Sequence, residues 1–142
     1  MKTQTFVRDS LEKALADHSI LAGYFESFNT LFIDKTSEIT ARTTNEIREV
    51  MKKVVDHFGH EEQRLFPSLL KADPSDQTAQ FVADLREEHK SLLRKIDQLL
   101  KILVNENSAN KRKSLLQRLL QDFSDDLEKH ANKENELFPS LI

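Results

Sequence analysis

Hydrophobic residues recur every three or four positions along most of this chain, which is the spacing of one face of an α-helix. Four long segments show the pattern and predict four helices. Their apolar stripes run from Leu11 to Phe32, from Ile47 to Leu65, from Leu85 to Leu103 and from Leu116 to Leu141. Helix-capping and turn-forming residues interrupt the pattern at residues 34–37, 72–76 and 105–110.

Composition agrees with a helical chain, because the 142 residues include only two Gly and three Pro. Short connections between helices favour antiparallel neighbours. We therefore predict an all-α fold, an up-down-up-down four-helix bundle that forms a single domain over residues 1–142.

The second and fourth predicted helices carry the same pattern, a His, a Glu four positions later and a Leu-Phe-Pro-Ser tail. The two copies are His57, Glu61, Leu65-Phe66-Pro67-Ser68 and His130, Glu134, Leu137-Phe138-Pro139-Ser140. An acidic residue and a His precede each copy, as Asp17-His18 and Glu88-His89. The repeat has an offset of 71 to 73 residues and predicts two similar helical hairpins, at about residues 1–72 and 76–142.

Six polar residues of this pattern interrupt otherwise apolar stripes, and they are His18, His57, Glu61, His89, His130 and Glu134. Burying an imidazole or a carboxylate without a partner costs several kcal/mol or forces neutralisation. A pair of metal ions would satisfy all six together, with imidazoles as terminal ligands and the two carboxylates bridging or capping the ions.

The spacing of these residues predicts that they meet at one level. Residues equidistant from the turn of an antiparallel hairpin lie at the same height. The midpoint of His18 and His57 falls between residues 37 and 38, and that of Glu61 and His89 falls at 75. The midpoint of His89 and His130 falls between 109 and 110. All three positions lie in or beside a predicted turn.

A single His-Glu pair has a simpler explanation, because such pairs on a helix surface are common and contribute only a few tenths of a kcal/mol. The repeated tail and the midpoints favour the metal site over that explanation. His60 lies off the apolar stripe and is left out of the ligand set. Tyr24 is interpreted as a half-buried packing residue, or as a residue lining an entry path.

Other features of the sequence exclude several classes of function. The chain has no cysteine, so disulfides, zinc-thiolate sites and cysteine-ligated clusters are excluded. A net charge of −3 with mixed signs does not indicate nucleic-acid or membrane partners, and we expect a cytoplasmic protein. The start His60-Glu61 is similar to a zinc-protease motif, but Arg64 stands where the second His would be.

With these residues, the chain resembles the hemerythrin-like domains, also called HHE cation-binding domains, from His18 to Ile142. The resemblance implies a four-helix bundle that holds two Fe ions bridged by oxo or hydroxo oxygen and by carboxylates. It also implies imidazole ligands at His18, His57, His89 and His130, with Glu61 and Glu134 as bridging carboxylates. Ligand type alone would also allow Zn or Mn.

The chain also departs from that family pattern. Oxygen-carrying hemerythrins have a further His one turn after the third-helix His, and Leu93 occupies that position here. Its absence leaves the coordination more open and argues against simple oxygen carriage.

We therefore expect a di-iron protein that binds or senses O2, NO or a related small oxidant, or that handles iron under stress. One alternative is a di-iron oxidoreductase, such as a peroxidase, an NO reductase or an iron-oxidising enzyme. Another is a helical interaction module that a metal stabilises. The sequence identifies no protein partner.

Overall fold

The structure is a computed structural model that describes residues 2–31 and 38–137, with side chains placed within 8–28 and 38–136. The described residues contain helices and turns and no strand, which confirms the predicted all-helical class. The elements follow the order α1 (Lys2–Leu31), α2 (Ala41–His60), the π-helical turn η1 (Glu61–Leu65), α3 (Phe66–Ala72), α4 (Asp76–Ile102), α5 (Glu106–Lys111) and α6 (Lys113–Leu137).

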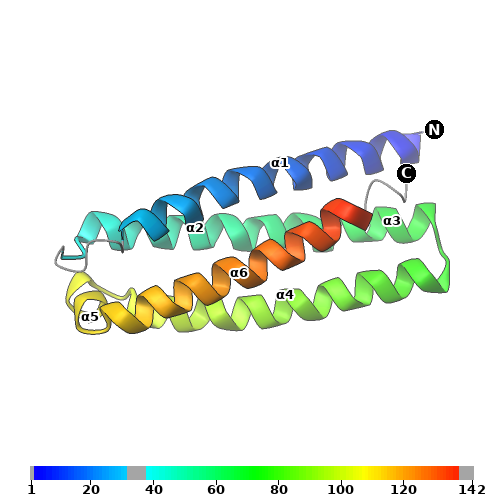
Figure 1. Ribbon diagram of the computed structural model, residues 1–142. Helices are drawn as coiled ribbons and strands as arrows, with labels where there is room; N and C mark the ends of the chain where they lie inside the picture. The colour runs from blue at the N-terminus through cyan, green and yellow to red at the C-terminus, as the bar shows by residue number, and fades with distance from the viewer. Residues whose placement is uncertain (1, 32–37, 138–142) are drawn as a thin grey trace.

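The long helices pack side by side as a helical bundle (Figure 1). Helix α1 contacts α2 and α6, and α4 contacts the same two helices from the other side. Helix α2 continues through η1 into α3 without a break in the chain direction, so these three elements form one continuous helical segment.

The sequence predicts the start of one long helix well. Ser75 precedes α4, and its side chain accepts a hydrogen bond from the backbone N–H of Thr78, as expected for a break at residues 72–76. Thr40 caps α2 in the same way through the N–H of Thr43. The predicted break at 34–37 lies outside the described residues.

The third predicted break is more structured than expected, because residues 106–111 form the short helix α5. Asn105 caps it by accepting from the N–H of Ser108. The side chain of Asn110 then binds both backbone groups of Ile39, with two bonds of 2.7 Å. These long-range bonds hold α5 against the start of α2, a contact that local turn chemistry does not reveal.

The buried apolar side chains form two clusters at opposite ends of the bundle. The larger cluster includes Ala109 of α5, and the smaller one includes Leu69 of α3. The six polar residues singled out above belong to neither cluster, although all six are buried. Among the described residues, no helix combines the length and apolar character that a membrane span requires.

Candidate metal centre

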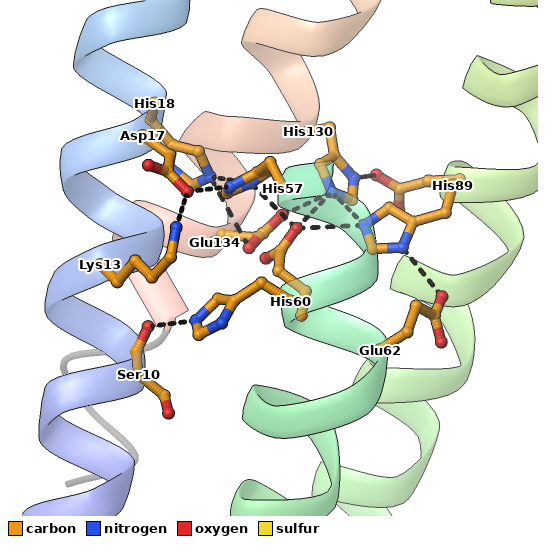
Figure 2. Close-up of polar contacts among 12 residues, drawn as sticks. Ser10, Lys13, Asp17, His18, His57, His60, Glu62, His89, His130 and Glu134 are labelled. Atoms are coloured by element: carbon orange, nitrogen blue, oxygen red, sulfur yellow. Dashed lines mark hydrogen bonds and ion pairs between the residues drawn. The ribbon is translucent and has the colours of Figure 1, made fainter. Parts of the chain in front are cut away.

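The six buried polar side chains meet between the helices of the bundle (Figure 2). They form two overlapping groups, in each of which one potential ligand atom per residue lies within 4.8 Å of those of the other residues. The groups are His18, His57, Glu61 and Glu134, and Glu61, His89, His130 and Glu134. Both carboxylates belong to both groups, so they stand between the two pairs of imidazoles.

The Nε2 atoms of the four imidazoles face this shared space. Those of His18 and His57 lie 3.2 Å apart, and those of His89 and His130 lie 3.0 Å apart. Oε1 of Glu61 lies 3.0 Å from Nε2 of His57 and 3.2 Å from Nε2 of His89. One carboxylate oxygen therefore reaches one imidazole of each pair.

The opposite nitrogen, Nδ1, of each imidazole has its own polar partner. Asp17 lies 3.1 Å from Nδ1 of His57, and Glu88 lies 3.0 Å from Nδ1 of His130. Glu62 lies 2.9 Å from Nδ1 of His89. The remaining imidazole, His18, has the side-chain oxygen of Asn135 at 2.9 Å.

These partners accept hydrogen bonds, so in a neutral imidazole Nδ1 carries the proton and Nε2 presents a lone pair to the shared space. All four side-chain oxygens of Glu61 and Glu134 are buried and lack a hydrogen-bond partner. Lone pairs of nitrogen and oxygen thus face one another at close range. A cation between them removes this conflict, and imidazole with carboxylate is a donor set that suits Fe, Mn or Zn.

The electrostatics of the site also favour a cation. Burial raises the pKa of Glu61, but contacts with the imidazoles of His130, His57 and His89 lower it more, so that the net pKa lies well below its usual value. Burial lowers the pKa of His57, yet the Glu61 and Asp17 carboxylates raise it above its usual value. The carboxylate of Glu61 is therefore ionised at neutral pH and attracts positive charge.

His18 differs from His57 in this respect. Burial holds the pKa of His18 below its usual value, even with the hydrogen bond to Asn135. The imidazole of His18 is therefore neutral at neutral pH, which is the form that binds a metal ion.

Aromatic rings cover one side of the site. The ring of Phe58 stacks on His89 with 4.2 Å between centroids and 19° between planes. Phe66 lies against the same imidazole, with 5.5 Å between centroids and 18° between planes. Both Phe side chains are buried, so they keep water away from His89 and fix the orientation of its ring.

The π-helical turn η1 explains how the chain passes Pro67 directly after the site. Proline has no N–H and its ring crowds the carbonyl four residues back, which in a regular helix is that of Gln63. The N–H of Phe66 binds the carbonyl of Glu61, five residues back, and this wider turn makes room. Helix α3 then continues to Ala72, so the chain stays helical past Pro67. Pro139 lies outside the described residues.

The sequence pattern did not reveal the partners of the Nδ1 atoms. Asp17 and Glu88 are the chain neighbours of His18 and His89, whereas each contacts the second His of its own hairpin. Glu62 and Asn135 were not singled out, although each directly follows a candidate carboxylate ligand. That position was the signal available in the sequence.

The two residues that the sequence left open lie outside both ligand groups. His60 is half-buried, and its Nε2 lies 3.1 Å from the backbone oxygen of Ser10 (Figure 2). Tyr24 is exposed rather than half-buried as the sequence suggested, with 38 % of its surface accessible, and it does not line the cavity next to His18. Leu93 is also 38 % exposed.

Comparison with known proteins gives one match. The family model of the hemerythrin HHE cation-binding domain matches residues 8–141, nearly the whole chain. No curated protein and no solved structure matches the chain.

Proposed function

We propose that this chain, which belongs to the hemerythrin HHE cation-binding domain family, holds two iron ions. We further propose that it binds or senses O2, NO or a related small oxidant. The observation that supports this most strongly is the set of four buried carboxylate oxygens without hydrogen bonds, which face four imidazole nitrogens. Family membership supports cation binding, and the choice of iron is part of the proposal.

His18 and His57 would hold one ion, and His89 and His130 the other. Glu61 and Glu134 would bind both, because each belongs to both ligand groups. When bound, iron supplies a redox-active centre to which small diatomic molecules can coordinate.

The protein's own residues prepare the site for that task. The Nδ1 partners fix each imidazole in the tautomer that presents Nε2 to the ion. The two carboxylates offset the positive charge of the ions in a buried layer. Phe58 and Phe66 exclude water on the His89 side, which limits unwanted reactions of an oxidant.

The proposal includes the finer topology. We take the bundle as an up-down-up-down four-helix arrangement in one domain, built from two repeated hairpins with the metal centre between them. The packing of α1 with α2 and of α4 with α6 supports this arrangement. The pairing of Asp17 with His57 and of Glu88 with His130, one within each hairpin, supports the repeat.

The test is anaerobic reconstitution of the metal-free chain with Fe(II), followed by metal analysis by plasma mass spectrometry. Optical spectra are then recorded before and after addition of O2, and separately of NO. We expect two irons per chain and a new absorption band with at least one of the two gases. Two bound ions without any spectral response would favour the metal-stabilised module instead, and no bound metal would contradict the site.

The same sample separates binding from catalysis. Sustained turnover of peroxide or NO, at rates above those of free iron, would assign the protein to the di-iron oxidoreductases. A single stoichiometric response without turnover supports binding or sensing.

A further inference from the structure

The two copies of the His-Glu pattern differ at two positions beside the proposed ligands. Glu62 follows the first Glu, whereas Asn135 follows the second. Phe58 follows the first His, whereas Ala131 follows the second. Both differences affect His18, because Asn135 contacts it and Ala131 lines a cavity beside it.

Asn135 gives His18 a neutral partner, while His57, His89 and His130 have carboxylate partners. A carboxylate that accepts the Nδ1 proton makes Nε2 a better electron donor, and a neutral amide does so less. Loss of such a partner commonly weakens metal binding by about 10–100-fold.

The two halves of the centre therefore receive unequal support. In the first half, formed by His18 and His57, only the imidazole of His57 is supported by a carboxylate. In the second half, formed by His89 and His130, carboxylates support both imidazoles. The ion in the His18 half should be held less tightly.

The second difference, Ala131 in place of Phe58, affects access from solvent to the metal site. A cavity of about 460 Å³ lies beside His18, between α1 and α6, with Leu21, Phe25 and Leu127 among its apolar walls. Ala131 lines it with a single methyl group, whereas the ring of Phe58 covers His89 in the other half. The ring of Phe58 fills the space beside His89. The small side chain of Ala131 leaves the corresponding space beside His18 open.

We propose that the His18 half is the exchangeable half of the metal centre, in which the ion binds more weakly and leaves through this cavity. The inference rests on the proposed two-ion function. A volume of about 460 Å³ is in the range of small-molecule pockets, about 300–1,000 Å³, so a small chelator can reach the ion through it. The carboxylate of Glu128 in its lining favours metal cations over anions.

The first test is titration of the metal-free full chain with Zn(II) in competition with a chromophoric chelator, which gives two stepwise dissociation constants. We expect the constants of the natural sequence to differ by about 10–100-fold. Asn135→Asp places a carboxylate where the amide stands, with the same shape. It should tighten the weaker constant by about tenfold and change the tighter one little.

Two further variants make this result specific. Asn132→Asp adds the same charge to the cavity lining on α6, but not at the position that binds Nδ1 of His18, so it should have a much smaller effect. Glu62→Gln should weaken the tighter constant by about 10–100-fold and make the two halves similar.

The outcomes separate the inference from the proposed function. Two equal constants in the natural sequence, or equal effects of Asn135→Asp and Asn132→Asp, would overturn the inference and leave a two-ion centre standing. Fewer than two ions bound by the natural sequence would overturn both.

The cavity is tested by the rate at which the weaker ion passes to excess chelator. Ala131→Leu narrows the cavity and should slow this release several-fold while its dissociation constant changes little. An unchanged release rate would show that ions leave by another route and would contradict the role given to the cavity.

Discussion

The surroundings of Glu61 and of Glu134 differ although both residues have the same role in the proposed site. Glu61 opens the π-helical turn η1, and its own carbonyl accepts the N–H of Phe66. Glu134 lies within α6, which is α-helical throughout Lys113–Leu137. Both carboxylates are 0 % exposed.

The residues next to them extend this contrast. Glu61 is flanked by buried aromatic side chains, Phe58 and Phe66, which pack on His89. Glu134 is flanked by the half-buried Ala131 and the exposed Asn135 on the cavity side. One His-Glu pattern, used twice, therefore gives a half covered by aromatic rings and a half that faces a cavity, because the neighbouring residues differ.

The largest expected effect comes from removing a shared carboxylate. Glu61→Ala should abolish binding of two ions, because Oε1 of Glu61 lies near an imidazole of each pair. Glu134→Ala should do the same if the two carboxylates are equivalent. Metal content after dialysis measures this, and Glu87→Ala on the exposed face of α4 is the control. Two tightly bound ions in both variants would disprove the ligand assignment.

Truncation of Phe58 tests how closely the half formed by His89 and His130 is packed. Phe58→Ala should lower the free energy of unfolding of the metal-free protein by about 3–5 kcal/mol, because it opens a cavity next to His89. Denaturant unfolding followed by circular dichroism gives the value. Val55→Ala on the same helix, at a side chain 41 % exposed, should stay within about 0.5 kcal/mol. A small loss for Phe58→Ala would show that this half is not closely packed.

Stepwise removal of the metal ions compares how much each half of the site stabilises the folded protein. Each ion present at about 100 times its dissociation constant should stabilise the folded state by about 2.7 kcal/mol. Increasing chelator should therefore lower the melting temperature in two steps, the first assigned to the His18 half. A single step in calorimetric scans would mean that both ions leave together and would contradict a difference in affinity between the two halves.

The smallest effect is expected at the lysines outside the site. Lys133 lies 2.7 Å from Glu88, and Lys13 lies 3.0 Å from Asp17. Partly exposed ion pairs contribute about 0.2–1 kcal/mol. Lys133→Met should cost more than Lys13→Met, because the Lys133 side chain is 35 % exposed and that of Lys13 is 56 % exposed. Unfolding at low and high salt checks the order, and a larger loss for Lys13→Met would reverse it.

Much of the helical organisation could be predicted from the sequence, because it depends on local properties. Apolar spacing locates the long helices, and capping chemistry places the start of α4 after Ser75. The midpoints of the paired residues predict that six distant side chains lie at one level of the bundle, because helix rise and turn position together set the height of a residue. The structure brings the same six residues together.

Other features depend on how the helices rotate and pack against one another, and sequence spacing does not contain that information. The contact between Asn110 and Ile39, which holds α5 in place, joins residues 71 positions apart. The π-helical turn before Pro67 also depends on a backbone conformation that the spacing of residues does not reveal.

By itself, the sequence determined the long helices and the residues that can serve as ligands. The spacing of apolar residues and the chemistry of each side chain are properties of single segments. Only the tertiary structure decided which residue supports which imidazole. Asp17 is adjacent to His18 in the chain, yet it binds His57 on α2, and His18 binds Asn135, 117 positions away on α6. Adjacent residues point in different directions around a helix, about 100° apart, so the packing of neighbouring helices selects each partner.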